Sequence, residues 1–179
     1  MKLKKKLRIG FDLDGVIVGK PFFVPGFLME ALIRDSSKKA LSYRFPENKF
    51  EQWARMMSHH PILRPKIDKN IKLIRELYKS RNYEVYAVSS RYSFLESRTK
   101  EWFEYNKLNS LFKEIYINNN NEQPHLYKKR MIEKLKLNVF IDDDIPLLEY
   151  LKKHTSGVEL LYVDDGENHF KKKLAWTFW

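Results

Sequence analysis

Two aspartates that follow an apolar run near the start of the chain are the residues best suited to chemistry. The segment 7–18 reads LRIGFDLDGVIV, so Asp12 and Asp14 lie where a buried strand would run out into a loop, and Gly15 lets the chain turn. In an open parallel sheet, ligands bind at the edge where the strands end. Two carboxylates at that edge can hold a hard metal ion and transfer protons. The segment therefore predicts a metal-assisted acid–base site.

Two other sites that use similar residues are excluded by the positions that follow. A calcium-binding loop that starts at Asp12 needs a glutamate at its twelfth position, where this chain has Phe23. A phosphate-binding P-loop over residues 10–15 needs Lys and then Ser or Thr, where this chain has Val16 and Ile17. The chain has no cysteine, which excludes thiolate catalysis and the usual structural zinc sites. Its five histidines show no metal-site spacing.

Length and composition predict a globular protein with an anion-attracting surface. The chain has 179 residues, of which 43% are hydrophobic, and these suffice for one domain with a modest insertion. Its net charge of +11 favours anionic partners, although a lysine-rich surface by itself explains that charge equally well. The basic start, residues 2–8, is followed by a segment that Asp12 and Asp14 interrupt, so no signal-peptide core is present. No apolar run is long enough to cross a membrane, and we expect a cytoplasmic protein.

Strand-like and helix-like segments alternate over most of the chain. The expected strands are 7–12, 84–88, 114–117, 138–141 and 158–163, and helical patterns separate them. This alternation with short connections predicts an α/β fold with right-handed crossovers and a parallel sheet. We expect a Rossmann-like three-layer sandwich in which five parallel strands have helices on both faces.

Residues 20–64 interrupt this alternation and predict a small, mostly helical cap. The core domain would then comprise residues 1–19 and 65–179. Apolar residues in 50–57 recur at helical spacing. We favour packing of the insertion's aromatic side chains into a core of its own over stacking on a base. These aromatic residues are Phe22, Phe23, Phe27, Phe45, Phe50 and Trp53, and the basic residues beside them are Arg34, Lys38, Lys39, Arg44, Arg55 and Arg64.

Polar residues end the other predicted strands of interest and would meet Asp12 and Asp14 at one sheet edge. Ser89 follows the strand 84–88, and Asp142 and Asp143 follow the strand 138–141. The helix that opens at Pro124 carries two adjacent lysines, Lys128 and Lys129, in its first turns. Taken singly, each of these residues has a simpler explanation as a helix cap or a surface side chain. Together they provide a nucleophile, a second acid, a hydroxyl donor, a cation and further carboxylates.

The order of these motifs resembles the haloacid dehalogenase-like (HAD) superfamily of phosphohydrolases. Phe11-Asp12-Leu13-Asp14-Gly15 is similar to its DxDG motif, and Ser89-Ser90-Arg91 to the Thr-x-Arg variant of its second motif. Phe140-Ile141-Asp142-Asp143 is similar to its closing acidic motif. Lys128 has the spacing to the closing acidic pair that is more usual for the lysine of the third motif. Lys129 remains an alternative for that lysine. The resemblance covers nearly the whole chain outside the insertion, and it extends more weakly to the cytosolic 5′-nucleotidase branch.

The resemblance implies a role for each matched residue. Asp12 would be the nucleophile that forms an aspartyl-phosphate, and Asp14 the acid that protonates the leaving oxygen. Mg²⁺ would be held by the carboxylates of Asp12 and Asp142 and by the main-chain carbonyl of Asp14. Ser89 would donate a hydrogen bond to the phosphoryl group, and Lys128 would neutralise charge. Asp143 would orient the lysine or a metal-bound water.

The function that follows is Mg²⁺-dependent hydrolysis of a small phosphomonoester, with a nucleoside monophosphate as one candidate. The net charge leaves a second hypothesis open, a phosphatase of nucleic-acid ends or a non-catalytic nucleic-acid-binding relative. A third is a mutase that transfers the phosphoryl group instead of releasing it. The expected partner is a small phosphorylated metabolite or a nucleotide, and the sequence does not indicate an oligomeric state.

Overall fold

The fold is a three-layer α/β sandwich, seen in a computed structural model that describes residues 6–21 and 41–163. Within this part of the chain, five parallel strands form one sheet in the order β3-β2-β1-β4-β5. The strands are β1 (Leu7–Phe11), β2 (Tyr83–Tyr92), β3 (Glu114–Asn118), β4 (Val139–Asp142) and β5 (Glu159–Tyr162). The predicted fold class is confirmed.

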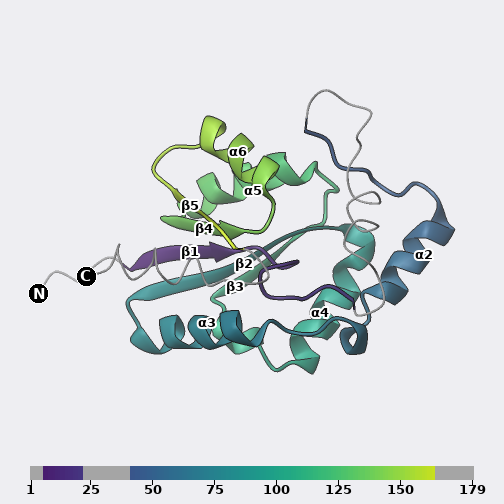
Figure 1. Ribbon diagram of the computed structural model, residues 1–179, viewed down its shortest axis with the longest axis horizontal. Coiled ribbons are helices and arrows are strands. Elements are labelled where there is room, and N and C mark those ends of the chain that lie inside the picture. The colour runs from purple at the N-terminus through teal and green to yellow at the C-terminus, as the bar shows by residue number, and fades with distance from the viewer. Residues whose placement is uncertain (1–5, 22–40, 164–179) are drawn as a thin grey trace, which may run out of the picture.

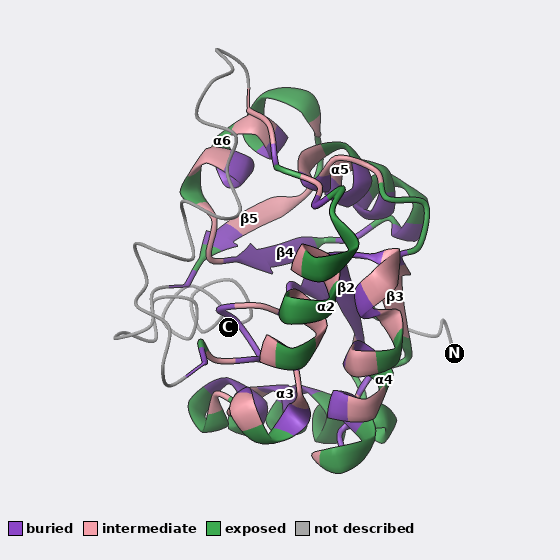
Figure 2. Ribbon diagram, turned by 90° about the vertical axis from the view of Figure 1, so that its right-hand side faces the viewer, coloured by how far each residue is buried: buried purple, intermediate pink, exposed green. Residues whose placement is uncertain are grey.

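Helices cover both faces of the sheet (Figure 1). On one face lie α3 (Asp68–Ser80) and α4 (Glu96–Tyr105), and on the other lie α5 (Pro124–Leu135) and α6 (Ile145–His154). The helix α2 (Lys49–Ser58) lies beyond the carboxyl ends of the strands (Figures 1 and 2). Three short 3-10 helices complete the structure, η1 (Pro61–Leu63), η2 (Ser93–Leu95) and η3 (Asn109–Leu111).

The alternation of side chains along β1 decides which layer each one meets. Ile9 and Phe11 pack into the cluster formed with α3 and α4, so Gly10 and Asp12 face the α5 layer. In β4, Ile141 belongs to the α3–α4 cluster and Phe140 to the α5–α6 cluster, so Asp142 also faces α5. The register pairs Phe11 with Ile141, which sets Asp12 and Asp142 side by side. The alternation of side chains along β1 and β4 therefore places both acids on the face of the sheet that α5 covers.

A tight turn after β1 leads into a short pairing with a distant segment. The amide of Gly15 donates to the carbonyl of Val18 at 2.8 Å, and Gly15 has a φ of 73°. Gly19 and Ile67 then donate across to Pro65 and Ile17, respectively, which pairs residues 17–19 with residues 65–67. The chain thus leaves and re-enters the core at one point, beside the end of β1. The bounds of the cap, 20–64, remain a prediction, and residues 22–40 lie outside the described residues.

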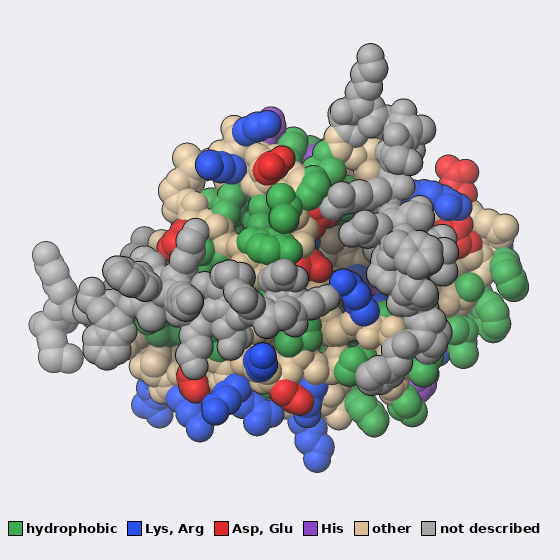
Figure 3. All heavy atoms as spheres, in the orientation of Figure 1, with side chains coloured by type: hydrophobic (Ala, Val, Ile, Leu, Met, Phe, Trp, Pro, Cys, Tyr) green, Lys and Arg blue, Asp and Glu red, His purple; other side chains and the backbone are tan. Residues whose placement is uncertain are grey.

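Two features of the expected elements are wrong. The polar residues of the second motif do not follow β2 but lie within it, because the strand continues to Tyr92 with a shift of register after Ser89. The stripe on α2 is helical as expected, but it is not buried: Phe50 is 71% and Trp53 is 52% exposed. These two rings stack on each other at 5.8 Å, and Figure 3 shows apolar side chains exposed over this helix. Phe22, Phe23 and Phe27 lie outside the described residues.

Candidate active site

Three carboxylates and one ammonium group meet where β1 and β4 end beside α5. Oxygens of Asp12, Asp142 and Asp143 all lie within 4.8 Å of one another. The Nζ of Lys128 is 3.0 Å from Oδ1 of Asp12 and 2.7 Å from Oδ2 of Asp142. The side chains of Asp142 and Lys128 are 0% and 3% exposed. A cation thus bridges the two strand-end acids in an environment that excludes most water.

Burial and repulsion from neighbouring carboxylates raise the pKa of each acid in this group. Burial, with Asp142 nearby, raises the pKa of Asp12 to about 7 even though Lys128 opposes the shift. Burial and the charges of Asp142 and Asp12 raise the pKa of Asp143 to about 8. Burial disfavours the ammonium of Lys128, but Asp12 and Asp142 hold its pKa well above its usual range. One lysine does not neutralise three carboxylates, so the group favours a further cation.

Asp14 is held in the opposite way, by two arginines. Arg91 donates from Nε to Oδ2 at 2.8 Å and from Nη2 to Oδ1 at 2.7 Å. Arg64 donates from Nη2 to the same Oδ1. Burial alone would raise the pKa of Asp14, yet Arg91 and Arg64 hold it well below its usual range. The side chain of Asp14 is 39% exposed, so a ligand can reach it, and in this state it is an anchored carboxylate.

A hydrogen-bonded chain orients Asp142 from behind. The backbone N–H of Asp144 donates to Oδ1 of Asp142 at 3.0 Å. The carboxylate of Asp144 caps α6 by accepting from the N–H of Leu147, and it also accepts from the hydroxyl of Tyr43 at 2.6 Å. Tyr43 belongs to the segment predicted as the cap, so that segment contacts the acidic group indirectly on this side.

Strand register and one glycine position Ser89 and Asp143, respectively. Phe11 pairs with Ala87 across β1 and β2, which sets Ser89 one step beyond the level of Asp12 on the neighbouring strand. Ser89 is 1% exposed, and its Oγ accepts from the N–H of Arg91 at 3.3 Å. A Cβ at Gly15 would overlap the carboxylate of Asp143, so glycine is required there both for its positive φ and for the space that it leaves.

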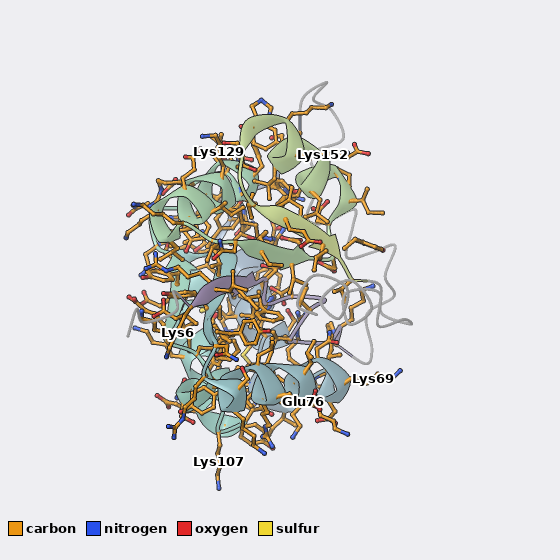
Figure 4. All side chains as sticks on the ribbon, turned by 90° about the vertical axis from the view of Figure 1, so that its left-hand side faces the viewer. Lys6, Lys69, Glu76, Lys107, Lys129 and Lys152 are labelled. Atoms are coloured by element: carbon orange, nitrogen blue, oxygen red, sulfur yellow. The ribbon has the colours of Figure 1, made fainter. Side chains whose placement is uncertain are left out.

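The structure separates the two candidate lysines. Lys128 points from α5 into the site, whereas the Nζ of Lys129 pairs with Glu133 one turn along the same helix at 2.6 Å. Figure 4 shows Lys129 at the edge of the molecule, away from the sheet. A step of one residue turns a helical side chain by about 100°, which explains why adjacent lysines have opposite environments.

The donor set fits the magnesium ion expected from the sequence. The three clustered acids offer hard oxygen ligands, which Mg²⁺ prefers, and the pKa values of Asp12 and Asp143 are raised by burial and by repulsion from neighbouring carboxylates. The carboxylate of Asp14, at the neighbouring turn, is engaged by the arginines and is not part of this cluster.

Sequence reasoning assigned no role to two residues of this site, Arg91 and Arg64. Arg91 stands in the quoted Ser-Ser-Arg motif, and its position at a buried strand end was the signal that could have found it. Arg64 was counted only among the basic residues of the insertion. It reaches Asp14 because residues 65–67 pair with residues 17–19, and that pairing leaves no recognisable local pattern.

Comparisons with known proteins identify the fold. No protein-family model matches the sequence, and no curated protein matches it. Among solved structures, a HAD-family enzyme from Bacteroides thetaiotaomicron, in complex with magnesium and inorganic phosphate, is 14% identical with a TM-score of 0.58. That match covers 91% of this chain and 96% of the other. A putative phosphatase from Clostridium difficile is 15% identical with a TM-score of 0.56, covering 94% and 90%.

A third match lies in a larger protein. A chain of the Pnkp1/Rnl/Hen1 RNA repair complex is 10% identical with a TM-score of 0.55, and the match covers 92% of this chain but only 44% of that one. The solved structures that the present chain matches are consistently HAD-superfamily hydrolases and phosphatases. This chain has the HAD fold. At such low identities the likeness concerns the fold, and the chemistry must be argued from the residues.

Proposed function

We propose that this protein is a Mg²⁺-dependent phosphohydrolase that acts on a small phosphomonoester, with Asp12 as its nucleophile. The observation that supports this most strongly is the environment of Asp12. Its carboxylate lies 3.0 Å from a buried lysine and within 4.8 Å of two further acids, at the sheet edge where ligands bind. An anionic nucleophile can approach a phosphate dianion only where such positive charge offsets their repulsion.

Each residue then has a defined task. Asp12 attacks phosphorus in line and forms an aspartyl-phosphate as the leaving oxygen departs. Lys128 stabilises charge on the nucleophile and the phosphoryl oxygens, and Ser89 donates a hydrogen bond to one of them. Asp14 would give a proton to the leaving oxygen and later take one from the hydrolytic water. Because its arginine partners keep it ionised, it must first be released from one of them and take up that proton from solvent. Asp143, whose carboxylate lies against Gly15, orients Lys128 or a metal-bound water.

Mg²⁺ would be held by the carboxylates of Asp12 and Asp142 and the carbonyl of Asp14, and would supply charge neutralisation of the phosphoryl oxygens when bound. Tyr43 and Asp144 keep Asp142 oriented for that purpose. A nucleoside monophosphate remains the candidate substrate suggested by the weaker resemblance to the 5′-nucleotidase branch.

The test is release of inorganic phosphate from p-nitrophenyl phosphate with Mg²⁺ or with a chelator. We expect wild-type turnover only with Mg²⁺, and we expect Asp12→Asn to lose on the order of 10³-fold or more of the activity. Asp68→Asn is the matched control, because the Asp68 side chain is 80% exposed at the start of α3. Equal turnover by wild type and Asp12→Asn would refute the proposal. Transfer of the phosphoryl group without release of phosphate would indicate a mutase instead.

A second candidate substrate is a phosphate at the end of a nucleic acid. It is favoured by the match to a chain of an RNA repair complex and by the basic surface. Figure 3 shows Lys and Arg gathered along the lower edge, over α3, where Lys69, Lys72, Arg75 and Lys79 are exposed. This edge lies to the side of the active site, so we rank a small substrate first. Comparing kcat/KM for a mononucleotide and for an oligonucleotide with the same terminal phosphate, at low and high salt, separates the two.

A further inference from the structure

Arg64 is a buried cation at the active site whose donors are mostly unused. Its side chain is 3% exposed, and its Nη2 contacts Oδ1 of Asp14. Its backbone carbonyl accepts from Nε1 of Trp102 at 2.7 Å, which fixes the chain beside the site. Its Nε and Nη1 are enclosed, and neither has a hydrogen-bond partner in the described parts of the chain. Buried guanidinium donors are normally satisfied, so these two indicate a missing acceptor.

The contact between Arg64 and Asp14 duplicates one that Asp14 already has. Arg91 alone supplies a donor to each carboxylate oxygen, in the two-pronged geometry that guanidinium and carboxylate favour. Arg91 is itself fixed, because its Nη1 donates to the hydroxyl of Thr99 at 3.1 Å. Asp14 would therefore stay anchored if Arg64 left it. Of the two arginines, Arg64 is the one that can be exchanged.

The net charge of the site indicates which kind of ligand would accept hydrogen bonds from Arg64. Four carboxylates face three cations, which leaves one formal negative charge. The carboxylates are those of Asp12, Asp14, Asp142 and Asp143, and the cations are Lys128, Arg64 and Arg91. A divalent metal ion would leave one formal positive charge, which would attract a phosphate dianion and offset about half of its charge. Because Asp14 is 39% exposed, an anion that reaches it comes next to Arg64.

We propose that Arg64 is a phosphate-binding residue, drawn from Oδ1 of Asp14 to a phosphoryl oxygen when the substrate binds. This inference rests on the proposed function, and it adds that the segment before residue 65 supplies part of the phosphate site. The exchange gives the unused donors of Arg64 their acceptors. It also removes one of the two cations that hold the pKa of Asp14 down, while Arg91 keeps the carboxylate in place.

The test measures binding of inorganic phosphate, in the presence of Mg²⁺, by titration calorimetry. We expect Arg64→Ala to weaken phosphate binding about tenfold or more, and Arg64→Lys to recover part of the loss, because a charged hydrogen-bond partner is removed and then partly replaced. Arg98→Ala is the matched control, since Arg98 pairs with Glu101 on α4. Binding of Mg²⁺ alone should stay within about twofold of wild type in every variant, because Arg64 does not touch the three clustered acids.

Several outcomes would overturn the inference. One is wild-type phosphate affinity in folded Arg64→Ala, with folding checked by circular dichroism. If Arg64→Ala does not fold, Arg64→Lys decides, and wild-type affinity in that variant overturns the inference equally. Absence of phosphate binding by the wild type would also overturn it. Failure of the proposed function is distinguishable, because it is measured by turnover in Asp12→Asn, whereas this test measures equilibrium binding.

Discussion

The two sides of the loop between Asp12 and Gly15 balance charge in opposite ways. On one side, a single carboxylate, Asp14, faces two guanidinium groups. On the other side, three carboxylates face a single ammonium group, Lys128. Both groups are formed at the same edge of the sheet, so their difference reflects the partners that the sequence provides.

The size of the effect explains the opposite pKa shifts. At an effective dielectric constant of 20, two like charges about 4–5 Å apart repel by on the order of 3–4 kcal/mol. Lys128 offsets part of this for Asp12 and Asp142, but burial and the remaining repulsion still raise the pKa of Asp12 and Asp143. Asp14 has an excess of cations, and its pKa falls despite burial. The comparison teaches that the nucleophile's side lacks positive charge and the acid's side has a surplus.

The largest effect should follow from removing the one cation of the three-acid side. We expect Lys128→Met to lower kcat/KM for p-nitrophenyl phosphate by on the order of 10²–10³-fold, because Lys128 contacts the nucleophile directly. It should also destabilise the metal-free protein by about 3–5 kcal/mol at pH 8, since the buried acids Asp12 and Asp142 lose the cation that offsets their burial. Urea unfolding measures the second effect.

The neighbouring lysine provides the control for this prediction. Lys129→Met removes an exposed pair with Glu133, so we expect a change in stability within about 0.5 kcal/mol and wild-type kinetics. A loss of activity in Lys129→Met that equals the loss in Lys128→Met would contradict the assignment of the site lysine and the charge comparison built on it.

The pH dependence of stability should differ between the two sides. Asp12 and Asp143 have folded-state pKa values of about 7 and 8, above the ordinary value of 3.8, so the folded metal-free protein binds more protons than the unfolded chain. Its free energy of unfolding should therefore fall as pH rises from about 4 to about 8. Asp14 has the opposite sign: its contribution is present above about pH 4 and is lost as pH falls below that range.

Urea titrations at about pH 5.5 and pH 8.5 test this, with and without Mg²⁺. We expect a loss of a few kcal/mol at the higher pH in the metal-free protein. Mg²⁺ should restore stability mainly at the higher pH, because it binds the ionised carboxylates. Asp143→Asn should flatten the profile. A profile that rises with pH in the metal-free protein would show that the three acids are not short of positive charge.

The fold could be predicted well from the sequence, because the patterns that indicate strands and helices are local. Apolar runs that end in Asp12 and Asp142 located two strands, and alternation with helical patterns predicted the parallel sheet. Burial depends on distant partners, and this is where prediction failed. Phe50 and Trp53 have the spacing of a buried helical face, yet they are exposed, because spacing defines a face without defining what covers it.

The site was predictable for residues at strand ends and not for residues brought by tertiary pairing. Asp12 and Asp142 follow from strand position, and Lys128 was preferred from its spacing to the acidic pair while its neighbour remained possible. Arg64 could not be found in this way. Its contact with Asp14 requires a separation of 50 residues to be closed by backbone pairing at residues 65–67.

The smallest effect should come from the outermost link to the three-acid side. Tyr43→Phe removes a hydroxyl that donates to Asp144, whose N–H in turn orients Asp142. We expect a loss of about 1 kcal/mol in the free energy of unfolding, typical of one hydrogen bond, and a modest rise in the Mg²⁺ concentration needed for half-maximal activity. The KM for p-nitrophenyl phosphate at saturating Mg²⁺ should stay unchanged, since the Tyr43 hydroxyl donates to Asp144, on the acidic side. A changed KM with an unchanged Mg²⁺ requirement would place Tyr43 with the phosphate-binding residues and would break the division of the site into two sides.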